Sequence, residues 1–468
     1  ILISDQDGSI IAFESSSTED ACRGEETGLA PIIVLQPVGG TFSEGDEITL
    51  SVLAIGTSPI TYQWYKDGSA IDLATDPDYY IESMHIDNIG SYYCVATNDL
   101  GSDTSESASI YGVRMYSAGS NWYGEMGFNY DSISYDTFML NEFKNIKKII
   151  SNGGNSFMLL NDGELYFSGY NGNGEGGVGH TSQVNEWTLS ATGVVDVFLG
   201  GDNTSFYIGE DNKLYFSGNN WVGQAGNGAS QNQYNEWVHV ADNAIFACGS
   251  ANNTSFYIDT EYNLHYSGGN SAYEAGVSST GEVHSWSPCG ITAKKIVCGW
   301  SDSMIIRPDN TVWVAGTSYS GAFGLGTTYV VQQWTECTSL SGVSAKDICI
   351  SAESPGSHAL VLSEEDNVYA SGGNSAGELG LGDGDNRYAF EQVASGVSYI
   401  SCGYRFSMLL TNDNRVLVSG YNGSGMHGDG TYQYKNVFTE VATGVVGIME
   451  SSSSLTSFIL KEQTGPIE

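Results

Sequence analysis

Residues 165–177 read Leu-Tyr-Phe-Ser-Gly-Tyr-Asn-Gly-Asn-Gly-Glu-Gly-Gly, and stretches of the same pattern return along the 468-residue chain. The first glycine of each copy is its most regular member. These glycines are Gly119, Gly169, Gly218, Gly268, Gly316, Gly372 and Gly420, so neighbouring copies lie between 48 and 56 residues apart. Strand-like pieces that repeat at this interval are typical of a β-propeller with one blade for each repeat. The sequence therefore predicts a seven-bladed propeller.

Each copy has the same internal order. A strand ends in Ser-Gly or Ala-Gly, and a glycine-rich loop follows with an asparagine two residues on. These loop residues are Asn121, Asn171, Asn220, Asn270, Asn374 and Asn422, with Ser318 as the exception. The loop closes on a glycine, and a variable stretch then reaches an aromatic residue. These aromatics are Phe143, Trp187, Trp237, Trp286, Trp334, Phe390 and Phe438. Since they recur in every copy, we expect them to fill the space between blades.

This order resembles the RCC1 (regulator of chromosome condensation) repeat, and residues 368–383 fit its pattern best. The resemblance covers nearly the whole of residues 113–460 and implies a propeller. The family includes an exchange factor for a nuclear GTPase and secreted bacterial propellers that bind and inhibit enzymes through a loop face. A fold shared so widely does not by itself define a function.

The two ends of the repeated region are complementary. The last copy ends in Ser457-Phe-Ile-Leu460 with no following strand, and the first begins with Val113-Arg-Met-Tyr116 with no preceding one. We expect these strands to pair, because the pairing would close the ring and remove an exposed sheet edge.

Residues 31–111 follow a different pattern of short alternating strands and resemble an immunoglobulin-like domain. Trp64 matches the buried tryptophan of strand C, and Tyr92, two residues before Cys94, matches the tyrosine corner. Val52 stands near the place of the first core cysteine, so Cys94 should have no partner in this domain. Many bacterial and phage immunoglobulin-like modules have this form.

The predicted fold is therefore all-β, with an immunoglobulin-like β-sandwich followed by a seven-bladed RCC1-like propeller. The predicted limits are 1–30 for a tail, linker or end of an upstream region, 31–111 for the sandwich, 112–462 for the propeller and 463–468 for a C-terminal tail. Residues 5–8, Asp-Gln-Asp-Gly, resemble the start of a calcium loop, but Ser16 stands where its glutamate should be. A plain turn is the better interpretation.

Composition excludes several classes of partner. The chain has 16 Lys and Arg against 55 Asp and Glu, for a formal net charge of -39. Because duplex binding depends on basic side chains that neutralise phosphates, nucleic acid and anionic membranes are unsuitable partners. No apolar stretch is long enough to span a bilayer, so membrane insertion is not expected. The eight cysteines show no disulfide or metal-ligand spacing. Equivalent positions in neighbouring blades are usually too far apart to bridge. We therefore expect these cysteines to be small buried core residues.

The positions that break the repeat carry the functional information. Large aromatics occur in some of the glycine-rich loops and are absent from others. These loops should share one face of the propeller. They are Trp122, Tyr123, Tyr170, Trp221, Tyr273, Tyr319 and Tyr421. Exposed Tyr and Trp are typical of binding surfaces, because they offer rigid contact area with a polar tip. The alternative is that the rings fold over their own loops.

Nothing in the sequence defines a catalytic residue, a cofactor site or a metal site. The leading hypothesis is a non-enzymatic structural or adhesive protein on a phage virion surface or outside the cell. Its propeller would bind a neighbouring virion or surface protein, or a host-surface glycan. The alternative is a bacterial secreted or surface protein that binds or inhibits another protein through the loop face. A third hypothesis is a hydrolase that uses acidic residues of this face.

Overall fold

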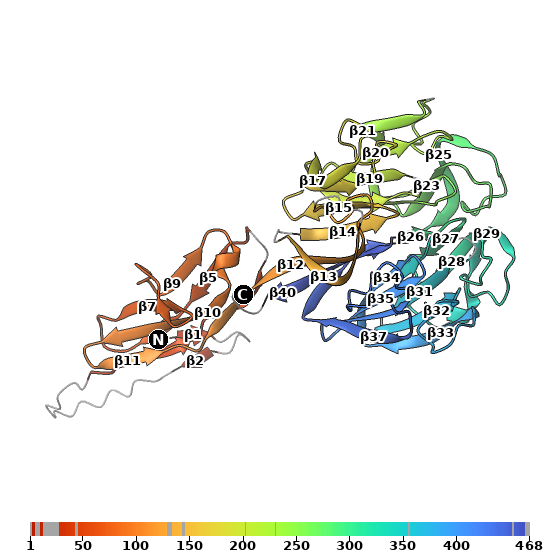
Figure 1. Cartoon of the computed structure of the whole chain (residues 1–468). Helices are drawn as coiled ribbons and strands as arrows, with labels where there is room; N and C mark the ends of the chain where they lie inside the picture. The colour runs from red at the N-terminus through yellow and green to blue at the C-terminus, as the bar shows by residue number, and fades with distance from the viewer. Residues whose placement is uncertain are drawn as a thin grey trace. The chain divides into compact units, whose positions relative to one another are not determined.

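The computed structural model describes residues 2–4, 10–12, 28–42, 45–128, 133–142, 146–201, 203–229, 231–353, 356–451 and 454–463. Contacts divide the chain into two compact units. The second unit contains Gly40–Ile48, Ile81–Gly90 and the chain from Ser109 onward. The elements are almost all strands (Figure 1). Two short 3-10 helices, η1 (Ile86–Asn88) and η2 (Thr338–Leu340), are also present. No helix in the described part of the chain is both long and apolar enough for a membrane span.

Most of residues 1–30 lie outside the described residues, including the calcium-loop motif and most of the predicted tail. Only the short paired strands β1 (Leu2–Ser4) and β2 (Ile10–Ala12) and residues 28–30 are described there. Phe143 and residues 464–468 also lie outside the described residues.

The immunoglobulin-like unit has the core that the sequence predicts. Trp64 and Cys94 face each other on the paired strands β7 (Thr61–Lys66) and β10 (Gly90–Asn98), and both are fully buried with Val52 and Tyr92 close to full burial. The indole N–H of Trp64 donates to the carbonyl of Asp76 at 3.0 Å. Cys94 is a free thiol, so packing replaces the inter-sheet disulfide, and burial raises its pKa to about 11.

The remaining strands before residue 108 are short because turns interrupt the chain every few residues. They are β3 (Ile32–Leu35), β4 (Gly40–Phe42), β5 (Ile48–Ser51), β6 (Leu53–Ile55), β8 (Ser69–Ala70), β9 (Asp78–Ile81) and β11 (Gly101–Thr104). The next strand, β12 (Ala108–Ser120), is much longer and crosses the boundary predicted at residues 111–112.

Six separate sheets form blades of consecutive antiparallel strands. The first three are β14 (Ile146–Asn152), β15 (Asn155–Leu160), β16 (Leu165–Gly169) and β17 (Val184–Ala191); β18 (Val194–Leu199), β19 (Thr204–Gly209), β20 (Leu214–Asn219) and β21 (Gln233–Ala241); β22 (Ala244–Gly249), β23 (Thr254–Asp259), β24 (Asn263–Gly268) and β25 (Val283–Thr292). The next three are β26 (Lys295–Cys298), β27 (Asp302–Ile306), β28 (Val312–Thr317) and β29 (Val330–Glu336); β30 (Ala345–Ile350), β31 (His358–Ser363), β32 (Asn367–Gly372) and β33 (Arg387–Ser395); β34 (Val397–Gly403), β35 (Phe406–Thr411), β36 (Arg415–Gly420) and β37 (Lys435–Thr443).

The prediction of seven blades is therefore corrected to six, because one copy of the repeat forms no sheet of its own. Its strands are β12, β13 (Ser134–Glu142), β38 (Val445–Ile448) and β40 (Thr456–Gln463), and β39 (Glu450–Ser451) joins the sheet of β14. They pair in the order β38-β40-β12-β13, and β12 also pairs with β4. This copy forms no sheet of its own because the long strand β12 contributes pairings along its whole length.

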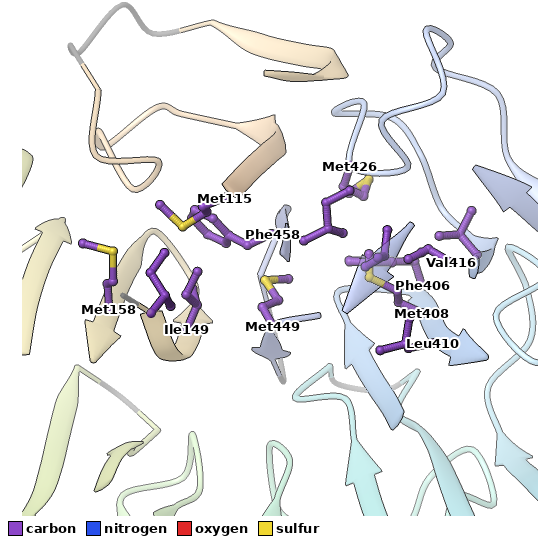
Figure 2. Packing of buried hydrophobic residues seen from close by; sticks show 14 of the residues in the cluster. Met115, Ile149, Met158, Phe406, Met408, Leu410, Val416, Met426, Met449 and Phe458 are labelled. Carbon is purple, nitrogen blue, oxygen red and sulfur yellow. The ribbon is translucent and has the colours of Figure 1, made fainter. Parts of the chain in front are cut away.

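The predicted pairing of the two ends is confirmed. β12 and β40 run antiparallel side by side, with Met115 opposite Leu460 and Ser117 opposite Phe458 (Figure 1). Met115 and Phe458 lie in one buried cluster with Met449 and with Ile149 of β14 (Figure 2). The first and last segments of the propeller thus share one core, and the ring has no open edge at this point.

The repeat aromatics fill the space between neighbouring sheets, as predicted. Each loop-closing glycine lies against the ring of the next sheet. The contacts are Gly127 with Trp187, Gly177 with Trp237, Gly226 with Trp286, Gly276 with Trp334, Gly324 with Phe390, Gly380 with Phe438 and Gly428 with Phe138. The last pair corrects the sequence assignment, because Phe138 of β13 occupies the position that was given to Phe143.

The prediction that no cysteines of neighbouring blades could bridge is wrong for one pair. Cys349 of β30 and Cys402 of β34 form a disulfide with their Cα atoms 5.8 Å apart. Cys349 lies opposite Leu360 and Cys402 opposite Ser407, so the two are offset by one residue in register, and the inner strands of adjacent sheets come close enough for such a pair to bridge. Cys289 and Cys337 are buried free thiols, as expected.

Candidate protein-binding face

The glycine-rich loops are held by the same hydrogen bond in every copy. The asparagine side-chain oxygen accepts the backbone N–H five residues on. The pairs are Asn121 with Met126, Asn171 with Gly176, Asn220 with Ala225, Asn270 with Ala275, Asn374 with Leu379 and Asn422 with His427, and Ser318 serves Phe323. The asparagine is therefore scaffold, and it gives all the loops one conformation.

A buried acidic residue supports the tip of several loops, and the sequence analysis missed it. In the loop after β16, the Glu175 carboxylate accepts the N–H of Asn173 at 2.9 Å. Burial raises the pKa of Glu175 to about 7. Hydrogen bonds from backbone N–H groups and from the Asn155 side chain lower this pKa by smaller amounts. The same position is taken by Glu125, Gln224, Glu274 and Glu378. The sequence could have revealed this position, because Glu or Gln recurs there four residues after the loop asparagine.

Three of the predicted residues project from equivalent loop positions into solvent. The exposed fractions are 60% for Trp122, 70% for Trp221 and 61% for Tyr319. Each follows the loop asparagine, or Ser318, by one residue. Because the loops share one conformation, these three rings lie on the same face of the propeller. They come from the loops after β12, β20 and β28.

The other predicted tyrosines are more enclosed. Tyr123 packs edge-on against Tyr170 with ring centroids 5.5 Å apart, and Tyr421 packs against Tyr434 at 4.9 Å. Tyr170 also lies over Gly172 of its own loop, and Tyr421 lies over Gly423 in the same way. For these two rings the alternative interpretation, folding over the loop, describes the structure. Tyr123 remains 40% exposed.

Tyr273 has a strained backbone. Its φ is +67°, in the left-handed region that bulky residues rarely adopt. The equivalent residue in the other copies is a glycine, namely Gly124, Gly174, Gly223, Gly321, Gly377 and Gly425, each with a positive φ. A tyrosine therefore stands where the loop conformation requires glycine.

The centre of this face adds residues that the sequence analysis missed. A hollow of about 200 Å³ is lined by Asn152, Asn155, Asn203 and Trp300, among others. Trp300 is 47% exposed in the turn between β26 and β27, and Tyr404 is 37% exposed in the turn between β34 and β35. Both directly follow a Cys-Gly pair, and their irregular occurrence at that position was a usable signal.

Within the described ranges, no three or more His, Cys, Asp or Glu side chains are grouped to hold a metal ion. Asp302 is fully buried beside the central hollow, where burial raises its pKa to about 7 and the Ser357 hydroxyl donates to it at 2.8 Å. Buried carboxylates of this kind position loops, whereas the exposed aromatics are available for contact with a partner.

Comparison with known proteins agrees with this architecture. An immunoglobulin domain model matches residues 30–98, and a model of the regulator of chromosome condensation (RCC1) repeat matches residues 397–425. The chain therefore contains an immunoglobulin domain followed by a β-propeller with RCC1-type repeats.

Individual relatives match one part each. The human X-linked retinitis pigmentosa GTPase regulator is 33% identical over 97 residues, which are 21% of this chain and 9% of that protein. Human Fc receptor-like protein 1 is 37% identical over 82 residues, 16% of this chain and 19% of that protein. The matches thus span less than a fifth of either relative's own length.

Among solved structures, Prp20p from Saccharomyces cerevisiae covers 74% of this chain and 91% of its own, with a TM-score of 0.65 and 14% identity. This likeness concerns the fold. Prp20p itself is described as binding Gsp1p and histones.

Proposed function

We propose that this propeller is a protein-binding module that recognises its partner through the face formed by Trp122, Trp221 and Tyr319. The observation that carries the proposal is the exposure of these rings, at 60% or more each, at one equivalent loop position. A loop framework needs no large ring there, since the other copies have Gly or Ser. Tryptophan and tyrosine are enriched in the residues that dominate binding energies at protein interfaces.

The strained Tyr273 supports the same proposal. Residues held in unfavourable backbone regions cost about 1–3 kcal/mol and cluster at functional sites. Six copies avoid this cost with glycine, and one retains a tyrosine on the binding face. A contribution of that ring to partner binding would account for its retention.

The charge of the chain indicates the kind of surface that the partner presents. With a net charge of -39, the chain attracts basic surfaces and repels acidic ones. A partner with a basic rim around an apolar patch fits both the charge and the aromatic residues. Prp20p, which shares the fold, is described as binding proteins.

The test compares three forms of the immobilised chain in extracts of its source. The face variant is Trp122→Ser/Trp221→Ser/Tyr319→Ser, and the control variant is Tyr80→Ser/Leu189→Ser/Tyr262→Ser, which removes exposed large side chains at other positions. We expect proteins retained by the wild type and the control to be lost with the face variant. Equal retention by all three forms would contradict the proposal.

Display on a virion surface or outside the cell, with recognition of a virion protein or a host glycan, remains a prediction from the two-module layout and the acidic composition. The animal relatives named above lend it no support. Imaging of native particles tests it, and absence of the chain from purified particles would exclude it. The lack of enzymatic activity also stays a prediction.

A further inference from the structure

Four consecutive innermost strands of the propeller each carry one cysteine. They are Cys248 of β22, Cys298 of β26, Cys349 of β30 and Cys402 of β34. The latter two form the disulfide between neighbouring sheets, and the former two are free thiols. Cys248, Cys298 and Cys349 all line one cavity of about 100 Å³ among the inner strands.

Cys248 and Cys298 repeat the strand registers of the disulfide pair, since Cys248 lies opposite Phe256 as Cys349 lies opposite Leu360, and Cys298 lies opposite Ser303 as Cys402 lies opposite Ser407. A backbone hydrogen bond joins the ends of β22 and β26, because the N–H of Ala251 donates to the carbonyl of Gly299 at 3.1 Å. Cys298 belongs to a buried cluster against which Cys248 packs. The two thiols also interact, and after burial this contact with Cys248 is the next cause that raises the pKa of Cys298.

The two thiols differ in their access to solvent. Cys298 is 4% exposed, whereas Cys248 is partly exposed. Because the attacking species is the thiolate, the more accessible Cys248 is the better first nucleophile and the buried Cys298 the better resolving group. The cavity beside these thiols admits a water-sized oxidant. Hydrogen peroxide, which is close to water in size, meets this requirement.

We propose that Cys248 and Cys298 form a peroxide-reactive thiol pair that closes into a second disulfide between neighbouring sheets. The Cys248 thiolate attacks one peroxide oxygen, the O–O bond breaks, and the released hydroxide takes a proton to become water. The resulting sulfenic acid is attacked by Cys298, whose proton leaves with the sulfenic hydroxyl as a second water. Two thiols and one peroxide thus give one disulfide and two waters.

The bond would link β22 to β26 as Cys349–Cys402 links β30 to β34. Two bridges would then secure four consecutive inner strands. Cys298 also lines the hollow at the centre of the aromatic face, but the chemistry of the thiol pair does not depend on the proposed partner binding.

The test is peptide mapping of the folded full-length chain under non-reducing conditions, before and after treatment with hydrogen peroxide. We expect a Cys248–Cys298 cross-linked peptide, lighter by two hydrogen atoms, that appears with peroxide and disappears with dithiothreitol. Cys289 and Cys337 are the internal controls and should remain alkylatable after denaturation. The Cys349→Ser/Cys402→Ser variant should still form the link, which excludes exchange with the existing disulfide.

Two single variants separate the roles of the thiols. Cys298→Ser should leave Cys248 as a sulfenic acid that a dimedone probe traps, whereas Cys248→Ser should leave Cys298 unmodified. The proposal is overturned if both thiols stay alkylatable in peroxide-treated wild-type protein, or if the link forms only after unfolding in urea.

Discussion

A methyl group placed on Gly177 would lie 2.1 Å from the indole nitrogen of Trp237 in the next sheet. The same relationship between a loop-closing glycine and an aromatic ring recurs around the whole propeller. Each glycine admits the ring of its neighbour, and the ring in turn covers the loop. The repeat thus encodes the interfaces between sheets as well as the sheets themselves.

Gly177→Ala should therefore destabilise the propeller by about 2–4 kcal/mol. A left-handed alanine costs about 1 kcal/mol, since φ is +64° at this glycine, and forcing a methyl group against the ring adds about 1–3 kcal/mol. Urea unfolding measures the change. Gly193→Ala is the matched control, because its φ is +69° and nothing lies within 4 Å of the added methyl. Equal losses for the two variants would show that the ring contact is unimportant.

Two tryptophans should separate stability from recognition. Trp237 donates to the Ser190 hydroxyl at 2.9 Å and packs on Tyr207, so Trp237→Ala should cost about 3–5 kcal/mol of unfolding free energy. Trp221 is 70% exposed, and Trp221→Ala should change stability by less than about 0.5 kcal/mol while weakening partner binding. Thermal unfolding and partner retention are the two measurements. A large loss of stability in Trp221→Ala would assign this ring to the scaffold.

The repeat pattern predicted what depends on local geometry. The period, the loop asparagine and the glycine–aromatic contacts were readable because each sheet imposes the same requirements on its own segment. The number of separate sheets was not, because it depends on how far β12 pairs along its length. The Cys349–Cys402 disulfide was missed for a similar reason, since the convergence of inner strands is a property of the closed ring.

The candidate site was only partly predictable. Trp122, Trp221 and Tyr319 are exposed as expected, whereas Tyr170 and Tyr421 fold over glycines of their own loops. Sequence spacing places all five in equivalent loops but does not fix the side-chain directions. The direction depends on whether the neighbouring residue is a glycine that a ring can cover.

The buried Glu175 should make stability depend on pH. Its pKa is raised to about 7 in the folded protein from 4.5, so the folded state holds the proton more tightly than the unfolded chain. Stability is therefore lost as pH rises from about 4.5 to 7. Glu175→Gln should remove this loss and stabilise the protein by about 1–3 kcal/mol at pH 8, with little effect at pH 4.

Urea unfolding at several pH values between 4 and 8 measures the difference between the wild type and Glu175→Gln. The substitution fits the site, since Gln224 stands at the equivalent place and accepts the N–H of Val222 at 3.0 Å. Glu210→Gln, at an exposed position, is the control for loss of a surface charge and should show no such pH dependence. A constant difference between Glu175→Gln and the wild type across the range would contradict the burial argument.

Tyr273→Gly tests whether backbone strain on the binding face serves recognition. Glycine adopts the positive φ of this position without cost, as it does in the other copies, so the variant should be as stable as the wild type or more stable by about 1 kcal/mol. If the tyrosine ring contacts the partner, the same variant should bind more weakly. Tyr273→Ala removes the ring but keeps a side chain in the left-handed region, and it should lose binding without the gain in stability. Unchanged partner binding in both variants would show that the strain has no role in recognition, and a loss of stability in Tyr273→Gly would show that the ring belongs to the scaffold.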